Sequence, residues 1–310
     1  MTTKDSLTTL WKKQVMSIVA LGSALDMLTA AVDGSVAALG ASDTGRIIYV
    51  GAGTPERIGI QDGAELLPTF GFPTERVVFM GAAGMRGLRR AIEGAEDLSQ
   101  NAVKRLTKLK LTPHDVVVCI ASSGTTPYVV AACEFARNAG AVTIGISSNP
   151  HSPLLQNAQF PVLTETGAEP IAGSTRMNAG TGQSATLKMW STAVMIKMGR
   201  TFGNLMVCMI PLNDKLRIRA RDMIVAVHQK FDHVCTPARA KRALEQAKEI
   251  LGPRETDKNI RLAIVIAGGQ NPQDAHRILE QHNYHLRPAM ASLGFKEISP
   301  DQRTNPTLKL

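Results

Sequence analysis

The sequence predicts an α/β protein with an open parallel sheet flanked by helices, and three observations support this fold class. Short apolar runs rich in β-branched residues recur between residues 45 and 203. Each run leads into a turn, most of these turns are rich in Gly or Ser, and segments with helical spacing separate the runs. Alternation of strand, turn and helix is typical of parallel strands joined by crossover helices.

The elements follow in order along the chain. Residues 5–40 have apolar residues at helical spacing and predict two helices or one long one, with Gly22 and Gly34 as candidate breaks. The first strand is predicted in RIIYVGAG, where an apolar run enters a Gly-rich turn. A long helix is predicted at residues 181–203, and the remaining strands are predicted at residues 77–82, 115–124, 141–150 and 159–165.

The pattern changes after residue 210 to charged helices with one short apolar run at residues 262–269. We therefore predict three parts: N-terminal helices at 1–39, the sheet domain at 40–210, and a smaller helical C-terminal part at 211–310. The helices of the last part are expected at residues 214–230, 237–251 and about 272–282.

Composition and cysteine usage limit the class of protein. The chain has 310 residues and no uninterrupted apolar run of about 18 residues, so we expect no transmembrane helix and no membrane partner. Its N-terminus lacks a clean apolar core followed by a cleavage site, which excludes a signal peptide. The cysteines have no CxxC or metal-ligand spacing, which indicates reduced thiols, a cytoplasmic protein and no metal site. They are Cys119, Cys133, Cys208 and Cys235, and Cys119 is expected in a buried strand.

The formal charge of +9 raises the question of nucleic acid. Aromatic residues are only 4% of the chain, too few for stacking platforms, and no basic nucleic-acid motif is present. We therefore expect no nucleic-acid partner. A positive field also attracts a small anionic substrate.

Three turns rich in Gly, Ser and Thr are candidate ligand loops, because open α/β sheets bind ligands beyond the carboxyl ends of their strands. Hydroxyl groups together with free amides at a helix N-terminus suit a phosphate, although ordinary turn and capping chemistry uses the same residues. No GxxxxGK[ST] loop, complete GxGxxG fingerprint or GxSxG elbow is present. The turns are GAGTPERIG (51–59), ASSGTTPYV (121–129) and AGSTRMNAGTG (172–182).

Two glutamates follow the first two predicted strands and could reach one crevice. Glu65 lies in DGAELLPTFG among uncharged neighbours, and Glu96 lies in the acidic stretch EGAED. A pair of carboxylates in unlike environments can supply one acid and one base near neutral pH. The alternative is structural: Glu65 caps or pairs locally, and Glu96 is a solvated helix end.

Taken together, the loops resemble the N-acetylmuramic acid 6-phosphate etherase family, which has the sugar isomerase (SIS) fold. The resemblance runs from about residue 40 to residue 225 and continues more weakly to about residue 290. The segments that carry it, in order, are RIIYVGAGT, DGAELLPTFG, AIEGAED, DVVVCIASSGTTPYV, ISSNP, GAEPIAGSTRMNAGT and FGNLMV.

The resemblance implies a lyase that cleaves the lactyl ether of N-acetylmuramic acid 6-phosphate to N-acetylglucosamine 6-phosphate and D-lactate, without cofactor or metal. It implies that Glu65 is the acid that protonates the leaving oxygen and that Glu96 is the base that removes the C2 proton. A phosphorylated amino sugar is the expected partner, and we expect a homodimer because SIS domains generally pair. The residues expected to bind the substrate are Thr54 and Arg57, with Ser122, Ser123, Thr125, Thr126 and Ser174 at the phosphate.

The chain departs from the family pattern in its loops. Pro55 and Glu56 stand where the family has Ser and Gly, Thr125 stands where it has Arg, and Asn178 stands where it has Lys. A carboxylate at residue 56 could repel a phosphate unless it points away. These changes leave two alternatives open: an SIS enzyme for a different phosphorylated amino sugar, and a non-catalytic sugar-phosphate sensor.

Overall fold

The computed structural model describes residues 1–90, 92–252, 254 and 256–298. Contacts within the chain divide it into two compact units. The first unit comprises Met1–Ala64 and Pro73–Val194, and the second comprises Glu65–Phe72 and the chain from Met195 onward. The N-terminal helices thus belong to the same unit as the sheet. The three-part division at residues 39 and 210 stays a prediction.

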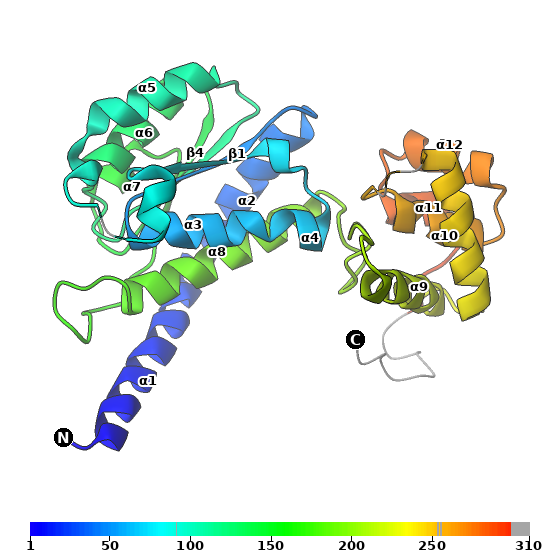
Figure 1. Ribbon diagram of the computed structural model, residues 1–310, viewed down its shortest axis with the longest axis horizontal. Helices are drawn as coiled ribbons and strands as arrows, with labels where there is room; N and C mark the ends of the chain where they lie inside the picture. The colour runs from blue at the N-terminus through cyan, green and yellow to red at the C-terminus, as the bar shows by residue number, and fades with distance from the viewer. Residues whose placement is uncertain (91, 253, 255, 299–310) are drawn as a thin grey trace. The chain divides into compact units, whose positions relative to one another are not determined.

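The first unit is built on a five-stranded sheet in which every pairing is parallel, in the order β2-β1-β3-β4-β5 (Figure 1). This confirms the predicted fold class. Each strand lies inside the apolar run that predicted it, which agrees with the near-continuous hydrophobic character of strands covered on both faces. The strands are β1 (Ile47–Gly51), β2 (Val77–Gly81), β3 (Val116–Ile120), β4 (Val142–Ser147) and β5 (Phe160–Leu163).

Helices cover both faces of this sheet (Figure 1). One face carries α2 (Leu25–Gly40), α3 (Thr54–Ala64) and α8 (Asn178–Lys197). The other face carries α5 (Ser99–Leu109), α6 (Pro127–Asn138) and α7 (Pro153–Asn157). Short 3-10 turns complete this unit at η2 (Thr74–Arg76), η3 (Gly84–Leu88) and η4 (Ala95–Asp97).

A buried polar network joins α3 and α8 to the sheet. Asp62 of α3 accepts hydrogen bonds from Tyr49 Oη at 2.7 Å and from Ser191 Oγ at 3.0 Å. Burial raises the pKa of Asp62, and hydrogen bonds from Tyr49 and Ser191 oppose that rise. Trp190 packs edge-on against Tyr49 with ring centroids 6.3 Å apart. These contacts hold the helices that bear the ligand loops in a defined position.

The N-terminal segment forms α1 (Thr3–Val19), a 3-10 turn η1 (Ala20–Ala24) and α2. The break predicted at Gly22 is therefore present, whereas the helix continues through Gly34. The Phe160 ring lies 2.4 Å from where a Cβ of Gly34 would stand, so this glycine permits close packing of α2 on β5. The continuous helical segment Thr3–Gly40 has the length and apolar composition of a helix that could cross a membrane. The core helices of soluble proteins meet the same two criteria.

The second unit is helical in its described part. The apolar run predicted at residues 262–269 belongs to a helix, α11, whose residues are all buried. A helix that is hydrophobic on every side is buried in a core, which is why this run shows no amphipathic period. The helices are α4 (Leu66–Phe70), α9 (Asp214–Gln229), α10 (Pro237–Leu251), α11 (Asn259–Ala267), α12 (Pro272–Gln281) and α13 (Leu286–Ser292).

Candidate active site

The first two ligand loops leave the sheet side by side. Strands β1 and β3 are neighbours in register, with Gly51 opposite Ile120, although they are not consecutive in the chain. The strand order reverses at this point, because the chain passes from β1 outward to β2 and then returns to β3. Ligands of open α/β sheets bind at such a reversal, outside the carboxyl ends of the strands. The site therefore starts from the loops after β1 and β3.

The turn after β3 is shaped by Gly124. Its φ of +69° is in the left-handed region, and a Cβ there would stand 2.2 Å from Ser152 Oγ and 2.6 Å from Ser147 Oγ. Both the backbone conformation and the close approach require glycine. The Gly124 amide donates to the Ala121 carbonyl at 3.1 Å, and its own carbonyl accepts from Leu154 at 3.0 Å. The turn is thus tied at both ends.

Three hydroxyls of this turn remain accessible at the start of α6. Ser123 and Thr126 are half-buried and Thr125 is exposed. Ser123 Oγ accepts from the Thr125 amide at 3.2 Å and from Thr125 Oγ1 at 3.0 Å. Thr126 precedes Pro127 at the N-cap position, and its hydroxyl makes no capping bond. Hydroxyls beside the positive end of a helix dipole form a site that suits an anion.

Ser122 is placed differently from its neighbours. It is buried, and its Oγ accepts a hydrogen bond from Gln183 Nε2 of α8 at 3.0 Å. The hydroxyl keeps its own proton, which it can donate to a ligand. Ser122 therefore also anchors the β3 turn to α8, a contact between residues 61 positions apart in the sequence.

The loop after β1 brings Thr54 and Arg57 to the start of α3. Thr54 Cγ2 lies 3.4 Å from the position that a Cβ of Gly180 would occupy, so the loop lies against α8. Arg57 donates from Nε and Nη2 to the Gly87 carbonyl at 3.1 and 2.7 Å. Arg57 thus holds the loop that follows β2. Its role in substrate binding stays a prediction.

Glu56 is buried beside this loop and points toward β2. Its side chain is 4% exposed, and neither carboxyl oxygen has a hydrogen-bond partner in the described part of the chain. Its Oε1 lies 1.6 Å from where a Cβ of Gly81 would stand, and Gly87 is also close. Burial raises the pKa of Glu56, while the charges of Arg57 and Arg105 oppose the rise. The carboxyl therefore points away from the β3 turn.

A side chain of the protein itself already occupies the N-terminal end of α8, the helix that follows the third predicted loop. Glu169 accepts hydrogen bonds from the Asn178 amide at 2.8 Å and from the Ala179 amide at 2.9 Å, at the first turn of α8. An internal carboxylate thus takes the place that an anionic ligand would use. Ser174 is half-buried in the same loop, with its amide bonded to the Ile171 carbonyl at 3.0 Å. Its contact with a phosphate stays a prediction.

Sequence reasoning missed Glu169, because this residue lies well upstream of Asn178, the first residue of α8, and not at a capping position. It also read Asn178 only as a lost positive charge. Asn178 is 1% exposed. Its side-chain Nδ2 donates to the Ala168 carbonyl at 2.9 Å, and its side-chain Oδ1 accepts from Gln14 Nε2 at 3.3 Å. Gln14 is also bonded to Thr181. Asn178 therefore joins α1 to the start of α8.

The two glutamates lie in different compact units. Glu65 directly follows α3, stands at the N-cap position of α4 without a side-chain capping bond, and belongs to the second unit. Glu96 lies on η4 in the first unit, after Gly94 in the left-handed conformation. Both side chains are exposed, and neither carboxylate makes a hydrogen bond or ion pair with another described residue. Their assignment to one site stays a prediction.

The uncharged neighbours of Glu65 do not bury it in this single chain. Glu65 is exposed despite the uncharged residues beside it in the sequence. In the described residues there is no group of three or more His, Cys, Asp or Glu side chains that could hold a metal ion. All four cysteines are free and buried, including Cys119 on β3.

Comparison with known proteins shows the family of this chain. The chain matches the Glucokinase regulatory protein N-terminal SIS domain over residues 31–137 and the SIS domain over residues 96–193. Among solved structures, it is similar to a phosphoheptose isomerase from Francisella tularensis, with 16% identity, a TM-score of 0.48, and coverage of 63% of this chain and 100% of that one.

Curated relatives are much closer in sequence. An N-acetylmuramic acid 6-phosphate etherase from Deinococcus radiodurans is 44% identical over 211 residues, which are 68% of each chain. An N-acetylmuramic acid 6-phosphate etherase from Escherichia coli O81 is 39% identical over 271 residues, which are 87% of this chain and 83% of that relative. The chain therefore belongs to the N-acetylmuramic acid 6-phosphate etherase family.

Proposed function

We propose that this protein is a carbon–oxygen lyase that cleaves the D-lactyl ether of N-acetylmuramic acid 6-phosphate, giving N-acetylglucosamine 6-phosphate and D-lactate. The observation that carries the proposal is the 39–44% identity to etherases over most of the chain. The retained glutamates and the open hydroxyl turn after β3 agree with it. This activity would serve the reuse of cell-wall amino sugars in the cytoplasm.

The reaction needs one base and one acid. In the open-chain sugar the C2 proton is alpha to the aldehyde, so Glu96 as base can remove it. The C3–O bond then breaks, and Glu65 as acid gives its proton to the departing lactate oxygen. Glu96 then returns its proton to C2, while Glu65 takes a proton from the water whose hydroxyl adds to C3. Each glutamate ends the cycle in its starting protonation state.

We place the 6-phosphate at the turn after β3. Hydroxyl donors at the N-terminal end of α6 come from Ser123, Thr125 and Thr126. The buried hydroxyl of Ser122 can donate one further hydrogen bond. Charge-assisted hydrogen bonds from hydroxyls and amides favour a dianion. Ser174 extends the phosphate site, and Thr54 lies at the sugar with Arg57. No carboxylate is needed near the phosphate, which agrees with Glu56 pointing toward β2.

A homodimer completes the proposal. α1 carries exposed apolar residues, of which Trp11 is 64% exposed and Val19 is 72% exposed. A free helix with such side chains needs a partner to cover it. A second copy of the chain is the occupant we propose, because closed two-fold pairing is the commonest assembly of soluble proteins. The exposed apolar residues of α1 are Leu7, Trp11, Val15, Met16, Ile18 and Val19.

The test is an assay for released D-lactate with purified protein and a panel of phosphorylated amino sugars. We expect release from N-acetylmuramic acid 6-phosphate and much weaker binding of the unphosphorylated sugar in a calorimetric titration. Equal affinity for both sugars would remove the phosphate assignment. Absence of lactate with every sugar, together with tight binding of one, would support a non-catalytic sensor instead.

A second candidate function has a specific observation in its favour. Thr125 stands where the family has Arg, and it is exposed in the middle of the phosphate turn. A hydroxyl there contributes less to anion binding than a guanidinium group. An SIS enzyme acting on another phosphorylated amino sugar is the alternative. The same panel decides, because this enzyme would turn over a different sugar faster than N-acetylmuramic acid 6-phosphate.

A further inference from the structure

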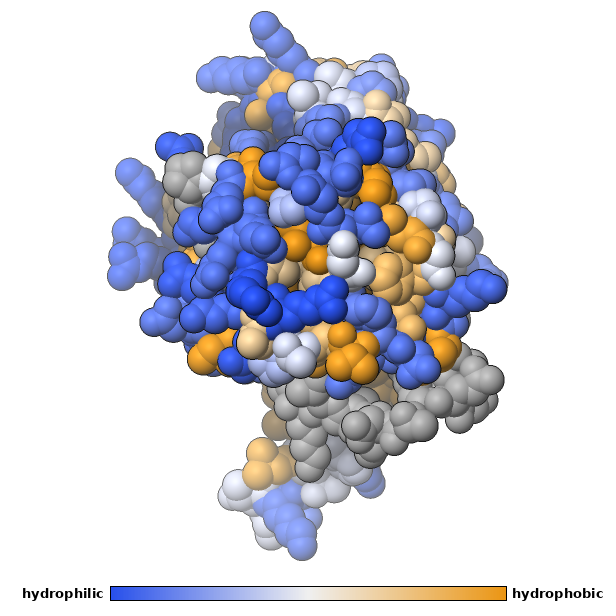
Figure 2. Space-filling view, turned by 90° about the vertical axis from the view of Figure 1, so that its right-hand side faces the viewer, coloured by the Kyte–Doolittle hydropathy of each residue, from blue (hydrophilic) through white to orange (hydrophobic). Residues whose placement is uncertain are grey.

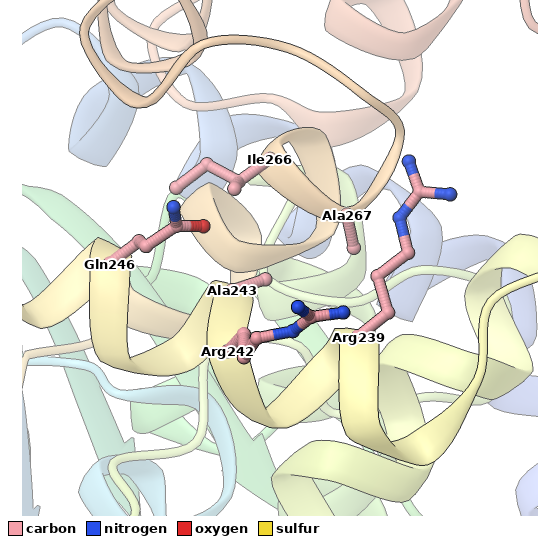
Figure 3. A pocket seen from close by; sticks show the side chains of 6 residues that line it. All are labelled: Arg239, Arg242, Ala243, Gln246, Ile266 and Ala267. Carbon is pink, nitrogen blue, oxygen red and sulfur yellow. The ribbon is translucent and has the colours of Figure 1, made fainter.

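The second unit contains a hollow of about 370 Å³ between α10 and α11. Figure 3 shows its lining: Arg239 and Gln246 extend away from α10, Arg242 lies along α10 toward the side of Arg239, and Ile266 and Ala267 belong to α11. Its floor is apolar, and its polar groups all come from one face of α10. None of these residues belongs to the proposed active site. The volume is within the range of small-molecule sites in proteins, roughly 300–1,000 Å³.

The lining of this hollow contains two arginines, and none of its other lining residues is acidic. They are three residues apart, so they share one face of α10, where like charges disfavour each other. Neither guanidinium makes a hydrogen bond or ion pair within the part of the chain that the structure describes. By contrast, Arg217, Arg277 and Arg287 of the same unit pair with carboxylates at 2.9, 2.8 and 3.0 Å.

The positive charge of Arg239 also affects the pKa values of three neighbouring side chains outside the lining of the hollow. Burial, with the charges of His233 and Arg239, lowers the pKa of His228 to about 4, and a hydrogen bond with the Ile264 backbone opposes the change. Burial also lowers the pKa of His233, again with a contribution from Arg239. Burial raises the pKa of the Cys235 thiol, and Arg239 opposes that rise. No carboxylate contributes to any of these three shifts.

The local backbone favours an anion as well. Arg239 is in the first turn of α10, where its amide donates to the Thr236 cap at 3.2 Å, and this helix end carries the positive pole of the dipole. Gly269 follows α11 with φ of +106°, and Arg239 Nη2 lies 3.5 Å from the position its Cβ would take. The glycine leaves the guanidinium room to turn toward a ligand.

We infer that this hollow is a second anion site, specific for a phosphomonoester on a small polar molecule. Two planar guanidinium groups complement a dianionic phosphate, with its two charges and several oxygens, better than they complement a singly charged carboxylate ligand. Gln246 offers an amide donor and acceptor to a hydroxyl of the ligand, and Ala243, Ile266 and Ala267 pack against its carbon atoms. Figure 2 shows one face of the molecule, on which hydrophilic side chains surround several hydrophobic groups.

The experiment is calorimetric titration of the full chain with N-acetylglucosamine 6-phosphate, inorganic phosphate, N-acetylglucosamine and D-lactate at one fixed salt concentration. With the active site also binding phosphate, we expect two phosphomonoester sites per chain. Gln246→Glu places a carboxylate beside Arg242, and because residue 246 is exposed the fold should be unaffected. This variant should lose one site, with at least tenfold weaker binding there. Arg239→Gln combined with Arg242→Gln should behave in the same way.

Lys241→Gln is the matched control, because Lys241 is an exposed cation on α10 outside the hollow. It should keep both sites. Equal weakening in Lys241→Gln and Gln246→Glu would mean general attraction by the net charge and would overturn the inference, as would an unchanged Gln246→Glu isotherm. Tighter binding of inorganic phosphate than of the sugar phosphate would overturn specificity for a phosphomonoester. If the active-site assignment fails instead, the wild-type count falls to one site and Gln246→Glu removes it.

Discussion

At the scale of single residues, the structure separates glutamates that look alike in the sequence. Glu65 and Glu96 are exposed and unpartnered, Glu169 caps α8, and Glu56 is buried without a hydrogen bond among the described residues. An exposed carboxylate that makes no internal contact is free to meet a ligand. A buried one costs free energy unless it is protonated or paired.

Glu65→Gln and Glu96→Gln should separate the two catalytic roles. Glu96→Gln should lose both lactate release and exchange of the C2 proton with deuterated water, because both need the base. Glu65→Gln should lose lactate release but keep the exchange, since deprotonation does not need the leaving group. Each loss should be about 10²–10⁴-fold, the usual contribution of a positioned acid or base. Mass spectrometry of the recovered sugar and a lactate assay measure the two steps.

Exposed Glu134→Gln on α6 serves as the control for these variants and should keep wild-type rates. Lactate release near the wild-type rate in Glu65→Gln would show that Glu65 is only structural.

Glu56→Gln should stabilise the protein at neutral pH. The pKa of Glu56 is raised in the folded state, so its contribution to stability is fully present below its unfolded pKa of about 4.5. That contribution is lost as the pH rises through the raised folded pKa. A neutral amide removes this dependence, so the variant should be more stable than the wild type only where Glu56 is ionised. Thermal unfolding at pH 5 and pH 8 measures it, with the larger difference between variant and wild type at pH 8.

At the scale of elements, the candidate site depends on turns that lead from strands into helices. The turn between β3 and α6 is held by Gly124, by the amide of Leu154 and by the Ser122–Gln183 bond. The start of α8 is held by Glu169 and by the contacts of Gln14 with Asn178. Each turn is thus fixed by a segment distant in the sequence. Such support presents hydroxyls in a set geometry and lowers the entropy lost on binding.

Gly124→Ala should damage the phosphate turn more than its backbone conformation alone explains. Gly140 is the matched control, because its φ of +84° is also left-handed but nothing lies within 4 Å of an added Cβ. Gly140→Ala should cost about 1–2 kcal/mol, the penalty of a left-handed non-glycine residue. Gly124→Ala adds the overlap with Ser152 and should cost more and weaken sugar-phosphate binding. Denaturant unfolding and calorimetry measure these effects. Equal costs at both positions would contradict the steric argument.

At the scale of the whole molecule, assembly is the next question, because exposed apolar residues are concentrated on α1. Trp11→Glu should shift the protein from dimer to monomer, since a charge at a covered apolar position is unfavourable. Lys12→Glu is the matched control on the same helix, where an exposed polar residue is replaced. Light scattering at micromolar concentration measures the mass. A monodisperse monomer in the wild-type protein would remove the homodimer.

Some features of this protein are determined locally. The five strands could be predicted from the sequence because a strand covered on both faces must be apolar along its whole length. The charged helices of the second unit and the break near Gly22 follow from local patterns too. The hydroxyl turns could be found because Gly and Ser are typical of the turns in which a strand leads into a helix.

Only the tertiary structure decided which of these residues are free to act. Glu56 is buried and Glu169 occupies the N-terminal end of α8, yet nothing in their local sequence distinguishes these two glutamates from Glu65 or Glu96. Arg57 binds the Gly87 carbonyl, which its local sequence does not indicate either. The helical state of α11 was also hidden, because a helix buried on all sides has no amphipathic period. Burial and partners depend on segments that are far apart in the chain, so a local pattern can identify reactive groups but not their surroundings.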